Sequence, residues 1–338
     1  MTAAAPPTPD EVADGIAGLL TRRDTSVVGV AVSRPERVFG GNARLAWSCE
    51  ATWTEDGARH IEPLILLVRA AGSQVTTDPS WEVAVLVRLS GQDVRAPKVW
   101  AQDLAGELLG APAVLLQRLP GQADPVAYLN ADPAVGRPRT LDLARAAAEL
   151  HAADPTGLSA GEPLVGGWRD RFLACRLEPH PTLSWLFDWL ADHTVTPAHV
   201  AVVHGDLRPG NVLYDGDRIV ALLDWEMAHV GDPVEDLAWA YRALWSPERF
   251  VPLDEFVRAY ESAGGSAVKP DALRWHRVFA EVKYATISLQ AARAVVDGRS
   301  HNLRLIDRAR TVAPALARCL DWLAEAGPVE SGCAGQPC

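Results

Sequence analysis

Long apolar runs are missing from this 338-residue sequence, although 48% of its residues are hydrophobic. No uninterrupted stretch approaches the roughly 20 apolar residues that a helix needs to span a membrane. The first nine residues also lack the basic start and the apolar core of a secretory signal. We therefore expect a cytoplasmic protein without a membrane partner. A chain of this length and composition can build two domains or lobes.

Positive charge is scarce as well. The formal net charge is −11, which argues against nucleic acid as a partner. Lysine occurs three times against 29 arginines, so most sites that need a cation have only arginine available. The five cysteines are odd in number and show no paired metal-binding spacing. We expect them to be reduced thiols.

The stretch 202–236 organises the remaining predictions. An apolar run, 200–203, leads into Asp206 and a turn that a Pro-Gly pair forces. Asn211 then opens a short strand, an Asp-Gly pair predicts a hairpin, and the return strand ends at Asp224. The two strands are expected to hold these three polar residues at one end of the hairpin.

These three side chains match the needs of phosphoryl transfer, in which a carboxylate orients the attacking hydroxyl and oxygen ligands hold the Mg²⁺ that bridges the phosphates. Kinases take the carboxylate from Asp in His-x-Asp-x4-Asn, and the ligands from that Asn and an Asp after the next hairpin. The spacing predicts Asp206 as the base, with Asn211 and Asp224 as Mg²⁺ ligands. Taken singly, each residue also fits an ordinary polar turn.

Two motifs in this stretch share their residue order with one enzyme family. They read His204-Gly205-Asp206-Leu207-x-Pro209-x-Asn211-Val212-Leu213 and Leu223-Asp224-Trp225-Glu226. Both resemble the aminoglycoside phosphotransferase family of small-molecule kinases, over roughly residues 30–320. The continuation, Gly231-Asp232-Pro233 and then Asp236-Leu237-Ala238, is most similar to the branch of kinase-like domains linked to acyl-CoA dehydrogenases.

The resemblance implies an α+β, two-lobed protein-kinase-like fold with ATP or GTP between the lobes. A small antiparallel-sheet lobe with an N-terminal helix is expected over residues 1–119. A larger, mainly helical lobe that carries the catalytic and acceptor-binding residues is expected over 120–326. The end of the chain, 327–338, is rich in Gly, Pro and Ser and is predicted to be disordered.

The nucleotide phosphates are assigned to two places in the small lobe. In the family, a hairpin at Gly40, Gly41 and Asn42 covers the phosphates with backbone N–H groups, and adjacent glycines permit that approach. The full Gly-x-Gly-x-x-Gly pattern is missing, so a plain hairpin turn is the alternative. Arg69 ends a buried strand at the point where kinases place a phosphate-binding Lys, and the resembled branch uses Arg there.

Glu82 is expected to pair with Arg69, because kinases pair their Lys with a Glu on the following helix. Here that helix is predicted over 81–89, with Glu82 in its first turn. The alternatives are an arginine on the surface and an acid that only serves the helix dipole. Further on, Gln117 and Leu119 precede a Pro-Gly break that is similar to the kinase hinge, so both are assigned to nucleotide binding.

Four residues around the motif receive supporting roles. His151 is expected to be a hydrogen-bonded core histidine, and Asp236 is expected to brace the catalytic loop. His204 should brace the same loop, with direct proton transfer as the alternative. Glu226 either orients a metal ligand or points to solvent.

Together these features predict an Mg²⁺-dependent kinase that transfers the γ-phosphoryl group of ATP or GTP to a hydroxyl group of a small molecule. A nucleotide-binding pseudokinase is the alternative that Arg69 and the incomplete glycine loop favour. A protein kinase is disfavoured because Asp232 and Asp236 follow Asp224 within twelve residues, which leaves no room for an activation segment.

The acceptor is predicted from charge. Residues 237–330 are expected to wall the acceptor site, and they carry 13 Lys and Arg against 11 Asp and Glu. Polycationic aminoglycosides would need carboxylates, whereas Arg274, Arg277 and Lys283 fall close together on a predicted helix. We expect a hydroxy acid or a hydroxyacyl thioester, with an antibiotic as the alternative, unless these cations face solvent. Most aromatic residues of this region, Trp239 among them, are expected in the core.

Overall fold

The computed structural model describes residues 7–38, 44–69, 79–158 and 164–325. The chain forms two compact units, residues 1–161 with 197–268 (unit 1) and residues 162–196 with 269–338 (unit 2). The predicted phosphate loop at Gly40, Gly41 and Asn42 and the predicted disordered tail, 327–338, lie outside the described residues. The domain boundary expected after residue 119 stays a prediction.

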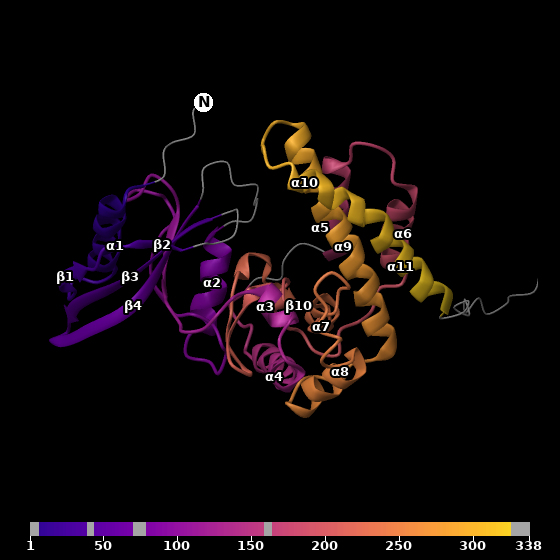
Figure 1. The fold of residues 1–338 in the computed structure, drawn as a ribbon, viewed down its shortest axis with the longest axis horizontal. Coiled ribbons are helices and arrows are strands. Elements are labelled where there is room, and N and C mark those ends of the chain that lie inside the picture. Colours follow the sequence, from indigo (N-terminus) through magenta and orange to yellow (C-terminus); the bar gives the residue numbers. More distant parts are fainter. Residues whose placement is uncertain (1–6, 39–43, 70–78, 159–163, 326–338) are drawn as a thin grey trace, which may run out of the picture. The chain divides into compact units, whose positions relative to one another are not determined.

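Unit 1 begins with helix α1 and an antiparallel sheet (Figure 1). The strand order is β1-β3-β4-β6-β5, with β2 beside β3. The bounds are α1 Pro9–Arg23, β1 Val28–Val32, β2 Glu36–Val38, β3 Arg44–Glu55, β4 Ala58–Arg69, β5 Val99–Asp103 and β6 Ala113–Gln117. The expected antiparallel sheet is therefore confirmed.

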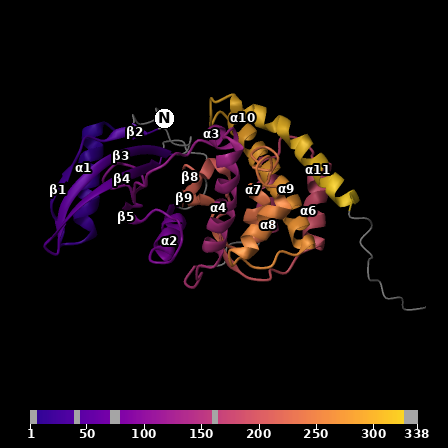
Figure 2. The same cartoon turned by 60° about the horizontal axis from the view of Figure 1, so that its bottom comes forward.

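Strand β4 packs against a cluster of apolar side chains on each face of the sheet. Successive side chains of a strand point to opposite sides, so alternate residues reach different clusters. Leu64, Leu66 and Val68 pack in the cluster that includes α1. Ile65 and Leu67 instead pack against the cluster that includes α2 (Pro79–Leu89), which Figure 2 shows away from α1. The continuous apolar run of this strand thus places one helix on each side of the sheet.

The rest of unit 1 is a set of helices around two short antiparallel strand pairs. Strand β7 pairs with β10, and β8 forms a hairpin with β9. The bounds are α3 Pro125–Leu129, α4 Pro133–His151, β7 Ala201–Val203, β8 Val212–Asp215, β9 Arg218–Leu222, β10 His229–Gly231, α7 Val234–Ala240 and α8 Leu253–Ser262. Helix α4 starts at Pro133 because Asp132 caps it, accepting from the N–H of Ala134 at 2.8 Å.

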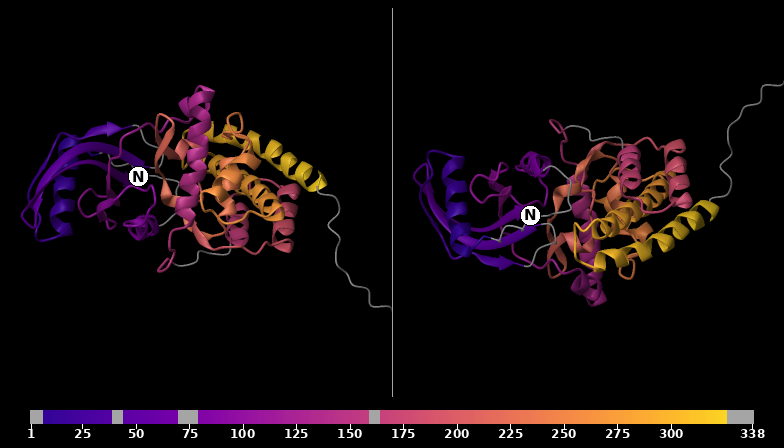
Figure 3. Two further views of the ribbon diagram at one scale, coloured as in Figure 1. Left: turned by 90° about the horizontal axis from the view of Figure 1, so that it is seen from below. Right: turned by 90° about the horizontal axis from the view of Figure 1, so that it is seen from above.

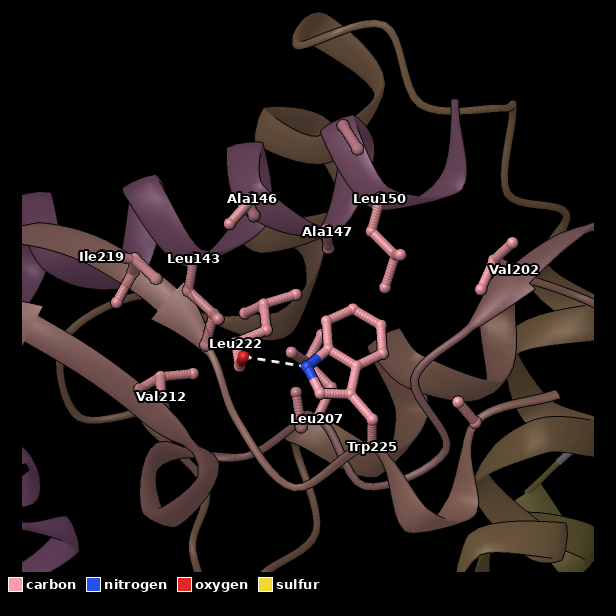
Figure 4. Close-up of a cluster of buried hydrophobic side chains, with 14 of the residues drawn as sticks. Leu143, Ala146, Ala147, Leu150, Val202, Leu207, Val212, Ile219, Leu222 and Trp225 are labelled. Carbon is pink, nitrogen blue, oxygen red and sulfur yellow. Dashed lines mark hydrogen bonds between the residues drawn. The ribbon is translucent and has the colours of Figure 1, made fainter. Parts of the chain in front are cut away.

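One apolar core supports both halves of the 202–236 stretch (Figure 4). Leu143 and Leu150 of α4 lie on the side of that helix that faces the strands and Trp225. Trp225 is 1% exposed, and its indole N–H donates to the carbonyl of Leu222 at 3.0 Å. The residue that follows Asp224 is therefore fixed in the same core as the hairpin before it.

Unit 2 is helical and is built around α9. Helix α9 packs against α5, α6 and α11, and α11 lies along it in both views of Figure 3. The bounds are α5 Leu164–Cys175, α6 Pro181–Asp192, α9 Pro270–Val296, α10 Arg304–Asp307 and α11 Val312–Glu325. In the described part of the chain, no helix combines the length and the apolar character that crossing a membrane requires.

The three cations expected to form a basic wall each contact a partner within unit 2. Lys283 is 1% exposed, and its ammonium lies 5.6 Å from the ring centre of Trp168. The guanidinium of Arg277 lies 4.0 Å from the ring centre of Trp322. Arg274 pairs with Asp271 one turn earlier. These contacts correct the expectation that the three cations gather toward an acceptor.

Candidate active site

The turn after β7 requires glycine at position 205. Gly205 has φ +77°, a backbone conformation that residues other than glycine rarely adopt. A Cβ at this position would also lie 2.2 Å from the carbonyl oxygen of Met227. The missing side chain therefore lets the 204–206 turn lie directly against η2 (Trp225–Met227), the short 3₁₀ helix that follows Asp224.

Asp236 holds this turn through hydrogen bonds to its backbone. Its carboxylate is fully buried and accepts the backbone N–H of His204 at 2.7 Å and that of Gly205 at 2.9 Å. It also contacts His151 Nε2 at 3.0 Å, and Nδ1 of the same ring lies 3.1 Å from the hydroxyl of Tyr260. The expected roles of Asp236 as a brace and of His151 as a hydrogen-bonded core residue are confirmed.

The same partners keep the brace charged. Burial alone would raise the pKa of Asp236, but the hydrogen bond and charge of His151, together with His204, hold it below its usual range. His204 itself is fully buried, and its Nδ1 accepts the backbone N–H of Asp206 at 3.2 Å. That hydrogen bond fits the expected bracing role of His204, and the alternative of direct proton transfer stays untested.

Asp206 is held by three side chains. Its Oδ1 accepts from the indole N–H of Trp239 at 2.6 Å and from Arg208 Nε at 3.0 Å. Its Oδ2 accepts from Asn211 Nδ2 at 2.5 Å. Since a carboxylate oxygen has about two acceptor positions, Oδ1 is saturated and Oδ2 keeps one position for a ligand. The carboxylate is thus fixed in direction with one acceptor position left.

Asp224 combines an unusual backbone with an unusual charge environment. Its φ of 67° and ψ of 67° are left-handed, which is rare outside glycine and clusters at functional sites. Burial, and then the charge of Asp206, raise the pKa of Asp224 to about 6. Burial, and then the charge of Asp224, raise the pKa of Glu226 to about 7. The negative charges of Asp206 and Glu82 thus act on both Asp224 and Glu226.

These donors fit a divalent cation. Asn211 directs its Nδ2 to the carbonyl oxygen and to Oδ2 of Asp206, which leaves its amide oxygen available as a ligand. Amide and carboxylate oxygens are the hard ligands that Mg²⁺ prefers, and a cation would offset the crowded charge beside Asp224. Within the described ranges, no three His, Cys, Asp or Glu side chains gather to hold a metal ion. Asn211 and Asp224 would therefore need further oxygens from a bound phosphate or water.

Glu82 pairs with Arg44, a residue that the sequence did not single out. The guanidinium of Arg44 lies 2.7 Å from Glu82 Oε2 and 3.3 Å from Glu226 Oε2. One arginine at the start of β3 thereby joins α2 to the segment after Asp224. Arg69 is its cross-strand partner at the end of β4, so both side chains start on the same face of the sheet.

The remaining predicted residues lie apart from these contacts. Gln117 ends β6, where its N–H donates to the carbonyl of Lys98 at 2.8 Å. Leu119 follows in the connection that leads from the sheet to α3 and is half-buried. Their assignment to the nucleobase, like that of Arg69 to the phosphates, stays a prediction.

Sequence reasoning missed Arg44, Arg208 and Trp239. Trp239 lies three residues after Asp236, so the helical period places both on one face of α7, and this spacing could have pointed to it. Arg208 lies inside the central motif, two residues after Asp206, at a position that the motif leaves variable. The contact from Arg44 to Glu82 crosses 38 positions and carries no local signal.

Comparison with known proteins finds a family model and several relatives that match this chain. A model of the phosphotransferase enzyme family matches residues 51–276. Acyl-CoA dehydrogenase family member 10 of Mus musculus is 25% identical over 188 residues, which are 52% of this chain but 18% of that protein. The chain thus spans less than a fifth of that relative. Homoserine kinase of Beijerinckia indica is 32% identical over 142 residues, 39% of this chain and 42% of that protein.

A solved structure shares the fold over most of the chain. It is a thermostable mutant of aminoglycoside phosphotransferase APH(4)-Ia in a ternary complex with ADP and hygromycin B. The likeness has a TM-score of 0.60 at 17% identity and covers 88% of this chain and 96% of that one. It confirms the expected α+β, protein-kinase-like fold.

The close approach at Gly205 can be tested by substitution. We expect Gly205→Ala to lower the melting temperature well beyond Gly216→Ala, because both glycines have positive φ but only Gly205 faces an atom that a Cβ would overlap. Circular dichroism during heating measures both variants. Equal melting temperatures would show that the contact with Met227 imposes no constraint.

The Arg44–Glu82 pair can be tested by a double-mutant cycle. Arg44→Gln should destabilise unit 1, because the side chain of Glu82 is only 7% exposed and loses its counter-charge. Glu82→Gln should destabilise it too, because Arg44 then loses the charge of this partner. The double variant should show a coupling of about 0.5–3 kcal/mol. Arg59→Gln, an exposed position on β4, serves as the control. Strictly additive changes in the free energy of unfolding, measured by chemical denaturation, would show that the two side chains do not interact.

Proposed function

The chain belongs to the phosphotransferase enzyme family, and from this premise we propose that it transfers the γ-phosphoryl group of ATP or GTP to a hydroxyl group of a small molecule, with Mg²⁺. The family model covers residues 51–276, which contain every predicted catalytic and metal-binding residue of this chain. Phosphoryl transfer to an alcohol is the reaction of a small-molecule kinase, and the homoserine kinase relative carries that activity in its name.

One observation carries the proposal: the fixed carboxylate of Asp206 beside the crowded carboxylate of Asp224. Trp239 and Arg208 saturate Oδ1 of Asp206, so a ligand hydroxyl can donate only to Oδ2. Asn211 holds that same oxygen and belongs to the predicted metal ligands. The acceptor hydroxyl and the metal-bound phosphates would therefore meet at one side of one carboxylate.

The reaction follows from that arrangement. The acceptor hydroxyl donates its hydrogen bond to Asp206 Oδ2, which points the oxygen lone pair at the γ-phosphorus. A bond forms between that oxygen and phosphorus while the bond from phosphorus to the β,γ-bridging oxygen breaks. The hydroxyl proton passes to Asp206, and the nucleoside diphosphate leaves. Mg²⁺, which Asn211 and Asp224 would hold, offsets the charge of the phosphates.

Nucleotide contacts are proposed for the small antiparallel sheet. Arg69, with Arg44 on the neighbouring strand, would face the phosphates, and Glu82 would hold Arg44 in place. Gly40, Gly41 and Asn42 would cover the phosphates, and Gln117 and Leu119 would meet the base. The related structure of APH(4)-Ia contains ADP, which supports a nucleotide donor.

For the acceptor we favour a hydroxy acid or a hydroxyacyl thioester. The names of the mouse relative and of homoserine kinase point to acyl groups and to an amino acid with a hydroxyl group. An aminoglycoside is the second candidate, favoured by the hygromycin B bound to APH(4)-Ia. The cations of α9 no longer support this choice, because unit 2 engages them.

Replacement of the base tests the chemistry. Asp206→Asn keeps the shape of the side chain but cannot take up the proton. Turnover should fall by about 10²–10⁴, the range of general-base contributions, while nucleotide affinity changes little. The measurement is ADP release with a panel of hydroxylated metabolites. A variant that turns over like the wild type would exclude Asp206 as the base.

Replacement of the charged ligand tests the metal. Asp224→Ala should weaken binding of the Mg²⁺–nucleotide complex more than Asn211→Ala does, because Asp224 contributes a charge as well as an oxygen. Calorimetric titration of nucleotide with and without Mg²⁺ separates the two effects. The assignment fails if wild type and Asp224→Ala depend on Mg²⁺ equally.

The acceptor class can be tested with the wild type alone. We expect hydroxy acids or their thioesters to be phosphorylated in preference to kanamycin-type amines. Phosphorylated products are identified by mass spectrometry after incubation with nucleotide and Mg²⁺. Efficient turnover of an aminoglycoside, together with none of any hydroxy acid, would contradict the preferred class.

A further inference from the structure

Arg208 lies next to the predicted catalytic carboxylate, and only part of its guanidinium is hydrogen-bonded to described residues. It follows Asp206 by two residues on extended backbone and precedes η1 (Pro209–Asn211). Its Nε donates to Asp206 Oδ1 at 3.0 Å. Its side chain is 30% exposed, against 13% for Asp206. The guanidinium therefore reaches from the reacting carboxylate toward solvent.

The outer edge of this guanidinium has no protein partner among the described residues. An arginine carries five N–H donors, four of them on its two Nη atoms. The hydrogen bond of Arg208 within the described part of the chain comes from Nε alone. Gly210 leaves room for the outer edge, because a Cβ there would lie 2.3 Å from Nη1. Four donors thus stay available beside Asp206.

Trp245 forms a platform for the same guanidinium. The Cζ atom of Arg208 lies 5.5 Å from the Trp245 ring centre, and that of Arg242 lies 4.7 Å from it. The indole N–H of Trp245 donates to the carbonyl of Trp239 at 2.7 Å. Trp239 in turn donates to Asp206. The platform and the carboxylate are therefore tied to one segment, which fixes Arg208 relative to both.

We propose that Arg208, on the Trp245 platform, binds the carboxylate of a hydroxy acid while Asp206 Oδ2 receives its hydroxyl. The fork of N–H groups on a guanidinium matches the two oxygens of a carboxylate. The proposal rests on the proposed phosphoryl transfer and narrows its substrate class. It selects the free acid over the thioester, because a thioester has no carboxylate to pair with Arg208.

Arg208 and the predicted metal ligand Asn211 contact different oxygens of Asp206. Asn211, the predicted metal ligand, contacts Oδ2 of Asp206, whereas Arg208 and Trp239 contact Oδ1. Arg44 pairs with Glu226, two residues after Asp224. The remaining N–H groups of Arg208 thus lie next to the carboxylate that would receive the acceptor hydroxyl.

The test compares acids with matched esters that keep the hydroxyl and remove the charge. The probes are lactate, glycerate and 3-hydroxybutyrate, each with its methyl ester. Arg208→Gln should raise the KM and the calorimetric Kd of the preferred acid about 10- to 100-fold, the value of a charge-assisted hydrogen-bond pair. The ratio of the acid KM to the ester KM should rise by the same factor, because losing the hydrogen bond to Asp206 affects both probes alike.

Four further variants define the cause. Arg258→Gln removes an equally charged, exposed side chain of α8 and should leave all constants unchanged. Arg208→Lys keeps the charge without the fork and should restore part of the affinity. Trp245→Ala should weaken binding of the acid as Arg208→Gln does, because the aromatic platform is lost. Trp245→Phe keeps an aromatic ring and should keep most of the affinity for the acid.

Each outcome decides a separate question. The subsite is refuted if Arg208→Gln impairs the reactions of the acid and the ester equally, since the guanidinium then serves the base. It is refuted as well if the variant raises the KM of the nucleotide, since the guanidinium then serves the donor. It is also refuted if no acid binds the wild type more tightly than its ester. Arg208-dependent binding of an acid without transfer to any acceptor would keep the subsite and reject the proposed function.

Discussion

The buried carboxylate of Asp236 is the interaction on which the site depends. It accepts the backbone N–H groups of His204 and Gly205, two donors that a tight turn cannot satisfy by itself. His151 keeps this carboxylate ionised in a place where burial alone would favour its neutral form. The direction of Asp206 follows from this support, because Asp206 is the next residue of the same turn.

The central motif could be predicted because its signals are local. A Pro-Gly turn, an Asp-Gly hairpin and two apolar strands placed Asn211 and Asp224 near Asp206 by spacing alone, and the structure shows the hairpin and the contact between Asp206 and Asn211. Asp236 could be assigned as a brace for the same reason. These residues are separated by short connections, so chain geometry fixes most of their arrangement.

The partners of the motif could not be predicted, since they come from distant segments. Glu82 was expected to pair with Arg69, and only the register of β3 with β4 shows that Arg44 lies on the same face as Arg69. Lys283 was expected to line the acceptor site, whereas α9 buries it next to Trp168. Net charge over a long segment says nothing about which charges that segment keeps for its own packing.

The contact between Gly205 and Met227 links two motifs by shape rather than by bonding. A chimeric gene that joins the first motif of one homologue to the second motif of another would combine surfaces that had not adapted to each other. Crossover points between residues 205 and 227 are thus unfavourable for recombination libraries. The stretch behaves as one exchangeable block, and sequence variation inside it is expected to be correlated across the contact.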